Sequence, residues 1–145
     1  MNGTERTRVP EWAFVALGSN LGDRRAALAF ARARLAELPD TELVAESGVE
    51  ETDPLGPVAQ GPFLNQMVLL KTGLAPHRLL YHCLQIERGA GRVRGERWGP
   101  RTLDLDIIRF GERTVDTPAL RLPHPELANR PFWQTGLDEL APHVV

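Results

Sequence analysis

Two aspartates separated by one residue, Asp104 and Asp106, are the side chains with the clearest potential for chemistry. They lie in the run Leu103-Asp-Leu-Asp-Ile-Ile, in which acidic residues alternate with apolar ones. Side chains two residues apart on a β-strand share a face, so both carboxylates would point the same way. Their Cα atoms would lie about 6.5 to 7 Å apart, because each strand residue advances about 3.3 Å.

Two carboxylates at this separation repel each other unless a positive charge lies between them. A hard cation such as Mg²⁺ accepts this arrangement, with phosphate oxygens and water completing its coordination shell. The alternative is that both aspartates only solvate the outer face of an amphipathic strand. The pair alone does not decide between these two interpretations.

The segment before the aspartates is rich in arginine. Between residues 88 and 101 five arginines accompany a single acid, Glu96. Guanidinium groups bind phosphate oxygens in a bidentate manner and stay charged at any relevant pH. We therefore expect a site for a metal-bearing anion such as a nucleoside triphosphate, on a glycine-flanked loop that could close over it. A solvated basic loop is the alternative. The five arginines are Arg88, Arg92, Arg94, Arg97 and Arg101.

A second group of candidates follows the proline-rich and glycine-rich segment from Thr52 to Pro62, which predicts a loop. Phe63 and Asn65 come directly after it and would share one strand face. An aromatic ring beside a carboxamide can stack on a flat heterocycle and read its hydrogen-bonding edge. Phe132 could supply a second ring. The alternative is that both phenylalanines are core residues.

Several classes of protein are disfavoured. The chain has no glycine-rich phosphate loop and no recognisable nucleophilic triad. Its single cysteine, Cys83, excludes an internal disulfide and a cysteine-built zinc site, and it fits a reducing cytoplasm. The net charge of -2 argues against a general nucleic-acid binder. No apolar stretch approaches the roughly 20 residues that a membrane helix needs.

The elements that position these residues follow from the hydrophobic pattern. Strand–helix–strand occurs twice, which predicts an α+β fold: a ferredoxin-like sandwich (βαββαβ) with an antiparallel sheet, both helices on one face, and an extra C-terminal hairpin and helical segment. Residues 1–10 are expected to be a flexible leader, and residues 11–145 a single domain. We expect strands at 12–18, 43–52, 63–72 and 103–110, a helix after the N-cap Asp23 ending at Pro39, a helix at 76–89, a hairpin turn at 111–113 into a short strand near 114–115, and a helical segment near 137–141.

The run from Gly95 to Ile107, Gly-Glu-Arg-Trp-Gly-Pro-Arg-Thr-Leu-Asp-Leu-Asp-Ile, closely resembles the signature of the 6-hydroxymethyl-7,8-dihydropterin pyrophosphokinase family. The resemblance covers nearly everything from Phe14 to Pro142. Further segments in the family's order are Phe14-Val-Ala-Leu-Gly-Ser-Asn-Leu-Gly22, Glu51-Thr-Asp-Pro-Leu-Gly-Pro57, Phe63-Leu-Asn65, Ile86-Glu87, Gly91-Arg-Val-Arg94, Pro123-His-Pro125, Asn129-Arg130 and Phe132.

The resemblance implies transfer of pyrophosphate from ATP to the hydroxymethyl group of the dihydropterin in folate biosynthesis, with release of AMP. It implies that Asp104 and Asp106 hold two Mg²⁺ ions and that Arg92 and Arg101 stabilise the transferring phosphates. The nucleotide would contact Glu87, Arg92, Arg94, Arg97, Trp98, Arg101, Ile107, His124 and Arg130. The pterin would contact Thr52, Pro54, Leu55, Phe63, Asn65 and Phe132.

This chain departs from the family pattern in places. Phe63 stands where some members have tyrosine, and Leu84 stands where a relative has a polar side chain. The loop between Arg94 and Arg97 is one residue shorter, so no role is assigned to Gly95 or Glu96.

Two other functions remain open, an RNA-binding ferredoxin-like module and an inactive relative that senses nucleotides. The first lacks paired aromatics on central strands. We expect a cytoplasmic monomer that binds small molecules, without nucleic acid or membrane partners.

Overall fold

The centre of the protein is a five-stranded antiparallel sheet in the order β2-β4-β1-β5, with β3 pairing with β4 as well. The computed structural model describes residues 6–53, 56, 60–91 and 102–145. The strands are β1 (Arg6–Ser19), β2 (Thr41–Glu46), β3 (Glu50–Thr52), β4 (Phe63–Leu74) and β5 (Asp104–Phe110).

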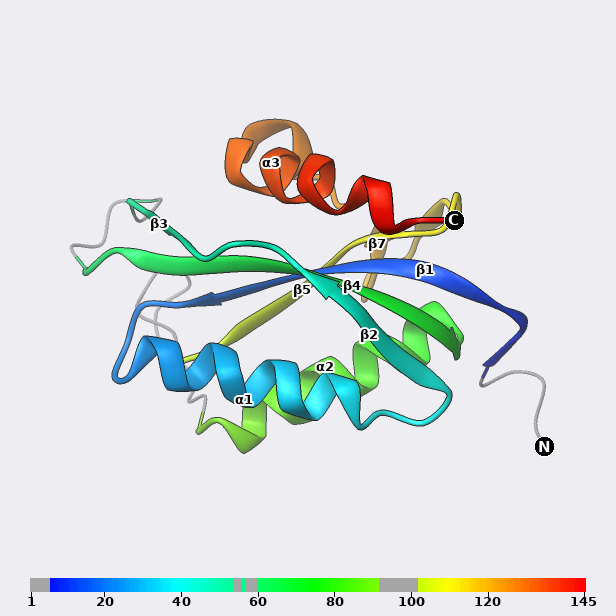
Figure 1. The fold of residues 1–145 in the computed structure, drawn as a ribbon, viewed down its shortest axis with the longest axis horizontal. Coiled ribbons are helices and arrows are strands. Elements are labelled where there is room, and N and C mark those ends of the chain that lie inside the picture. The colour runs from blue at the N-terminus through cyan, green and yellow to red at the C-terminus, as the bar shows by residue number, and fades with distance from the viewer. Residues whose placement is uncertain (1–5, 54–55, 57–59, 92–101) are drawn as a thin grey trace.

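Helices cover both faces of this sheet (Figure 1). Helices α1 (Arg24–Ala36) and α2 (Pro76–Gly89) lie together on one face, and α3 (Pro131–Leu140) lies on the other. Helix α1 begins after Asp23, whose Oδ1 accepts the backbone N–H of Ala26 at 3.0 Å. Pro76 opens α2, where its missing N–H costs no helical hydrogen bond. The predicted α+β class, antiparallel sheet and packed helices are confirmed.

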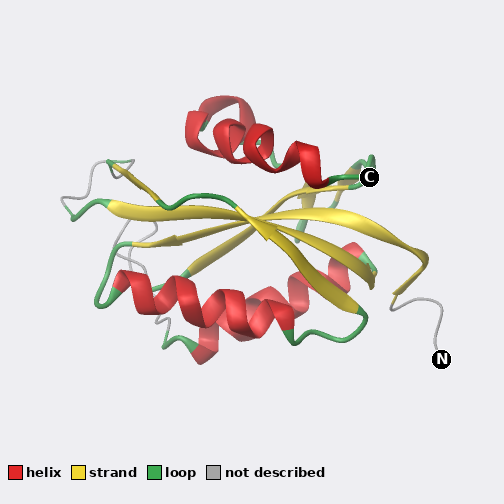
Figure 2. Ribbon diagram, in the orientation of Figure 1, coloured by secondary structure: helices red, strands yellow, loops and turns green. Residues whose placement is uncertain are grey.

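Alternate residues of the strands build two separate apolar cores. Val15, Leu17 and Leu105 face α1 and α2, whereas Ala16 and Ile108 face α3. Because the side-chain period of a strand is two, one strand serves both layers. Figure 2 shows the sheet as the middle layer between the helices.

The predicted strand at 43–52 is two strands with a break at Ser47. The backbone N–H of Ser47 donates to the carbonyl of Met67 at 2.8 Å, while its Oγ accepts the N–H of Met67 at 2.9 Å. A side chain thereby takes a place in the ladder that a backbone carbonyl would otherwise fill. Gly48 follows and favours the break, since glycine is disfavoured in strand interiors.

The chain after β5 also differs from expectation. A turn forms at Gly111, whose φ is +54°, but the next strand, β6 (Val115–Asp116), pairs with β7 (Arg121–Leu122) in a separate two-stranded sheet. Arg113 makes a bidentate bond to Glu11 of β1, at 2.9 Å for both Nε–Oε2 and Nη2–Oε1. This ion pair fixes the turn on β1, and β6 does not return along β5.

Two element boundaries were also wrong. Strand β1 begins at Arg6, so residues 6–10 of the expected leader belong to the sheet, with an irregular register between Arg6 and Glu11. Pro10 lies in this irregular segment, where a missing N–H is tolerated. Helix α3 begins at Pro131 rather than near Leu137. Two short 3-10 helices flank it, Leu127–Asn129 and Ala141–His143. No helix in the described ranges is long and apolar enough to cross a membrane.

Candidate active site

Strand β5 places Asp104 and Asp106 on the α3 face of the sheet. They lie opposite Gly18 and Ala16 of β1, whereas the alternating residues Leu105 and Ile107 are at most 5% exposed in the α1/α2 core. The two carboxylates therefore share one face, as the spacing predicted. The Asp106 side chain is 43% exposed, so it is accessible to a ligand.

His124 lies beside Asp106, with Nε2 3.7 Å from Oδ1. Its Nδ1 accepts the backbone N–H of Glu126 at 3.0 Å, and its own backbone N–H donates to the carbonyl of Ile108 at 2.9 Å. A neutral imidazole that accepts at Nδ1 carries its proton on Nε2. The backbone therefore sets the tautomer that directs an N–H toward the Asp106 carboxylate.

Trp133 gathers two of the predicted nucleotide residues around one ring. The His124 ring packs edge-on against it with centroids 4.7 Å apart, and the Arg130 guanidinium lies 4.7 Å from its centroid. Trp133 itself is 5% exposed and anchored in the α3-side core. A buried aromatic thus positions two cationic or donor groups on the face that carries the aspartates.

Glu87 and Ile107, both predicted to contact the nucleotide, are buried. Glu87 of α2 is 4% exposed, and its Oε2 accepts the backbone N–H of Leu105 at 2.7 Å. Since β5 is an edge strand, this carboxylate holds its backbone between the two aspartates. The Ile107 side chain packs in the α1/α2 core. A ligand on the aspartate face would have to use the backbone of Ile107.

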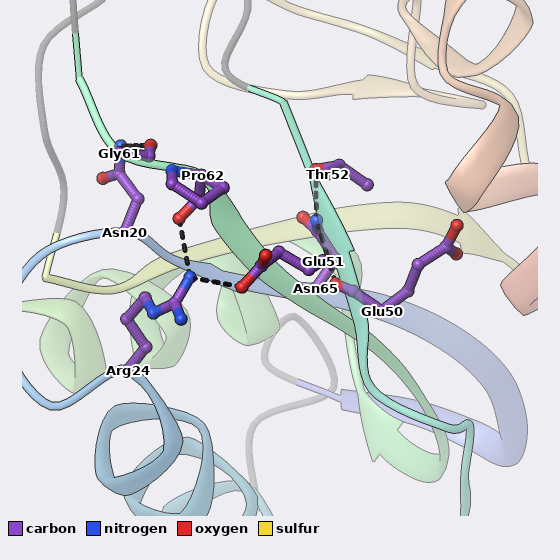
Figure 3. Close-up of polar contacts among 8 residues, drawn as sticks. All are labelled: Asn20, Arg24, Glu50, Glu51, Thr52, Gly61, Pro62 and Asn65. Carbon is purple, nitrogen blue, oxygen red and sulfur yellow. Dashed lines mark hydrogen bonds and ion pairs between the residues drawn. The ribbon is translucent and has the colours of Figure 1, made fainter.

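Pairing of β3 with β4 brings the predicted pterin residues Thr52, Phe63 and Asn65 together. The Asn65 amide donates to Thr52 Oγ1 at 2.6 Å, and Figure 3 shows this bond alongside a longer one to the Glu50 carbonyl. The Oδ1 of Asn65 is then left on the Gly18 side. A Cβ at Gly18 would lie 3.5 Å from that Oδ1 and 3.6 Å from the Phe63 ring. Gly18 therefore leaves room over both side chains.

Both ends of the segment between β3 and β4 are tied to the start of α1 (Figure 3). Arg24 donates to the carbonyl of Pro62 at 2.9 Å and pairs with Glu51 at 3.0 Å. Asn20 donates to the carbonyl of Gly61 at 3.1 Å. Neither Asn20 nor Arg24 was predicted as a site residue, because no local pattern shows that an early turn meets a distant loop.

A small cavity, about 30 Å³, lies between β4, the Ser47 break and α3. It brings together two predicted pterin residues, Asn65 and Phe132, but Phe63 and Thr52 are not in its lining. The Phe132 ring packs against Trp133 with centroids 5.9 Å apart. The other lining residues, none of which was predicted as a site residue, are Ser47, Gly48, Glu50, Gln66, Met67, Trp133, Thr135, Gly136 and Glu139.

The periodicity of α3 could have revealed part of this wall. Trp133, Leu137 and Leu140 recur at spacings of four and three, which is a helical pattern beginning after Pro131. The remaining lining residues carry no local signal, since their neighbours come from distant parts of the chain.

Seven predicted site residues lie outside the described ranges, and their roles stay predictions: Pro54, Leu55, Arg92, Arg94, Arg97, Trp98 and Arg101.

The donor set fits a hard cation that arrives with phosphate. Two carboxylates on one face supply oxygen ligands, which Mg²⁺ prefers. Within the described residues no group of three or more His, Cys, Asp or Glu side chains could hold a metal. Ligand oxygens and water would therefore have to complete the shell. Burial raises the pKa of the Cys83 thiol, so this cysteine is not a thiolate nucleophile.

The chain is similar to known proteins of one family along most of its length. The sequence profile of the family described as 7,8-dihydro-6-hydroxymethylpterin-pyrophosphokinase (HPPK) matches residues 14–142. A Pseudomonas aeruginosa protein named 2-amino-4-hydroxy-6-hydroxymethyldihydropteridine pyrophosphokinase is 48% identical over 131 residues, which are 90% of this chain and 81% of that protein. Proteins of the same name from Methylorubrum extorquens and Bacillus subtilis are 44% and 43% identical, covering 92% and 91% of this chain and 84% and 79% of theirs.

Proposed function

Because the chain belongs to the 7,8-dihydro-6-hydroxymethylpterin-pyrophosphokinase family, we propose that it transfers pyrophosphate from ATP to 6-hydroxymethyl-7,8-dihydropterin in folate biosynthesis. The hydroxymethyl oxygen attacks the β-phosphorus and loses its proton, while the bond between the β-phosphorus and the α–β bridging oxygen breaks and AMP leaves. The observation that supports this best is the shared face of β5, β1 and β4. It carries Asp104 and Asp106 at one strand and Asn65 at another.

Asp104 and Asp106 would hold Mg²⁺, two ions by the family resemblance, through oxygen ligands that suit this metal. Bound there with ATP, the metal would neutralise charge on the triphosphate and orient the β-phosphorus. His124 Nε2–H, aimed at Asp106, would hold that carboxylate or donate to a phosphate oxygen. Glu87 would keep the two aspartates in register by fixing the backbone of Leu105.

The arginines supply the remaining positive charge in this proposal. Arg130, held over Trp133, would reach phosphate oxygens from the α3 side. Arg92 and Arg101 would stabilise charge on the phosphates as the bond breaks, and Arg94, Arg97 and Trp98 would line the nucleotide.

The pterin would lie against Phe132 and Phe63, with its polar edge toward Asn65. Thr52 engages the amide nitrogen of Asn65 at 2.6 Å, which leaves Oδ1 to accept an N–H of the ring. The backbone near Pro54 and Leu55 would supply further hydrogen bonds. A flat ring of this kind gains from stacking on an aromatic side chain while its edge is read by polar groups.

We also infer the finer architecture and the state of the enzyme. The chain order β1-α1-β2-β4-α2-β5 with sheet order β2-β4-β1-β5 supports the ferredoxin-like sandwich. The five-stranded sheet joins β1 to β5, which supports a single pyrophosphokinase domain over residues 11–145, with the first residues of β1 extending it to Arg6. We propose a cytoplasmic monomer, and sedimentation of the purified protein at micromolar concentration tests the oligomeric state.

The function is tested by measuring AMP formed from ATP with and without the reduced hydroxymethylpterin and with and without Mg²⁺. AMP should appear only when all are present, in amounts equal to the pterin consumed. Release of ADP, or AMP without pterin, would contradict the proposal. Tight binding of RNA with no AMP formation would instead favour the RNA-binding alternative.

A matched pair of variants locates the activity. Asp106→Asn should abolish AMP formation, whereas Asp116→Asn should leave it unchanged. Asp116 lies on β6 with a side chain that is 84% exposed and paired with Arg121, so it controls for the loss of one acidic charge. Equal activity in the two variants would remove Asp106 from the reaction.

A further inference from the structure

Helix α3 is packed against β4 as closely as the backbone allows. A Cβ at Gly136 would lie only 2.7 Å from Cβ of Met67 and 3.3 Å from its Cγ and Cε. Real Cβ atoms do not approach that closely, so a side chain at this position would force the helix away from the sheet. Glycine costs about 1 kcal/mol relative to alanine in a helix, so close contact rather than helix propensity favours it here.

A second contact fastens the C-terminal half of α3 to the break between β2 and β3. Glu139 Oε2 accepts the backbone N–H of Gly48 at 3.0 Å. Ser47, the preceding residue, is bound to β4 through its N–H, its Oγ and its carbonyl, the last accepting Nε2 of Gln66 at 2.7 Å. The break is therefore rigidly attached to the sheet, and Glu139 attaches α3 to the break.

Glu139 and Phe132 belong to the same wall of the cavity. They are seven residues apart, two helical turns, and both line the space next to Asn65. The residues after Gly48 enter β3, whose Thr52 orients Asn65. The Glu139 carboxylate thus connects α3, which carries Phe132, with the segment that leads to Thr52, the residue that binds the Asn65 amide.

We propose that Glu139 is a positioning residue of the pterin site, to which Asn65 and Phe132 of this cavity belong. Its bond to the Gly48 N–H sets the gap between Phe132 on α3 and Asn65 on β4, without contact with the reacting atoms. The inference rests on the proposed function, which assigns Asn65 and Phe132 to the pterin. Glu139 lines the cavity next to Asn65, and Asp106 is not in that lining, so loss of Glu139 should affect pterin binding and leave nucleotide binding unchanged.

The test compares Glu139→Ala with Glu139→Gln, which keeps an acceptor oxygen, and with Asp138→Ala, which removes the neighbouring exposed acid of the same helix. In Glu139→Ala the KM for the pterin should rise about tenfold, the effect of losing one hydrogen bond to a charged group. The KM for ATP and kcat should stay within about twofold of wild type. Glu139→Gln should remain within about threefold for every constant, and Asp138→Ala should match wild type.

Hydrogen exchange gives a readout at the bond itself. The Gly48 amide should exchange faster in Glu139→Ala and at nearly the wild-type rate in Glu139→Gln. Should Glu139→Ala fail to fold, Glu139→Asp, whose shorter side chain withdraws the carboxylate, should show the same rise in pterin KM.

The outcomes separate this inference from the function on which it rests. No pterin binding to the wild-type protein, measured calorimetrically, would overturn the proposed function. Wild-type binding that is unchanged in Glu139→Ala would overturn only the role of Glu139. Equal rises in the KM for pterin and for ATP would also overturn it, because they would mean general damage to the fold.

Discussion

The two faces of the central sheet are made by alternate residues of the same strands, yet they differ in composition and in cover. Toward α1 and α2 the strands present Val15, Leu17 and Leu105 to a closed apolar core. Toward α3 they present Asp104 and Asp106 at one end, and the α-helix that packs there in the described part of the chain has ten residues, against thirteen in α1 and fourteen in α2. The face with less helical cover is the one that carries groups for chemistry.

This difference separates stability from activity at neighbouring positions. The alternation of a strand places a core residue directly between two acidic ones, so consecutive side chains serve different purposes. Substitutions one residue apart on β5 should therefore have opposite consequences.

The largest effect is expected at the aspartates. Asp104→Asn or Asp106→Asn should lower kcat/KM by at least about a thousandfold, because several kcal/mol of charge stabilisation through a bound metal would be lost. The melting temperature should not fall, since neither side chain belongs to a core. AMP release and a thermal melt measure the two quantities. Retention of a tenth of the activity would contradict the assignment.

The residue between the aspartates should show the reverse. Leu105→Ala should lower the free energy of unfolding by about 2 to 5 kcal/mol, as for other buried leucines. Activity per folded molecule should change far less than in Asp106→Asn, and urea unfolding together with the AMP assay checks both. A stable but inactive Leu105→Ala protein would break the division between the two faces.

Thr52 is expected to orient Asn65 on the α3 face. Thr52→Val removes the acceptor of the Asn65 amide while keeping the shape, and the KM for the pterin should rise about tenfold, the usual cost of an unpaired polar group. Thr52→Ser keeps the hydroxyl and should stay close to wild type. Steady-state kinetics at saturating ATP decide the result, and an unaffected KM in Thr52→Val would mean that Asn65 is oriented otherwise.

The smallest effect concerns the closed core. Burial raises the pKa of Cys83 above its ordinary range, so the folded protein keeps a neutral thiol when the unfolded chain ionises above about pH 8.5. The free energy of unfolding should consequently fall as the pH rises above about 8.5, because the unfolded chain loses the Cys83 proton while the folded protein keeps it. In Cys83→Ala this part of the pH dependence of stability should be absent, and urea unfolding at several pH values measures it. Rapid alkylation of native Cys83 at pH 8 would contradict its burial.

The parts of the site that the sequence predicts are those with a local pattern. Alternation around Asp104 indicated that Asp104 and Asp106 share a face, and the Asp23 cap and Pro76 located the starts of two helices. In each case the deciding interaction lies within a few residues of the pattern. The roles of the arginines and of the pterin residues came from the family resemblance.

The parts that the sequence did not predict depend on distant contacts. The break at Ser47 exists because its hydroxyl replaces a carbonyl in the ladder with Met67. The pairing of β6 with β7 and the attachment of Arg24 to Glu51 likewise join segments that no local pattern connects. Tertiary contacts override strand propensity at such places.

The division between the faces can be measured directly by titrating isotope-labelled protein with the pterin, Mg²⁺ and a non-hydrolysable ATP analogue while following backbone amide chemical shifts. We expect the largest changes at Asn65, at Phe132 and around Asp104 to Asp106, with small changes along α1 and in the segment 114–122. Saturable shifts concentrated on the exposed side of α1, with none at Asn65 or Asp106, would contradict the account.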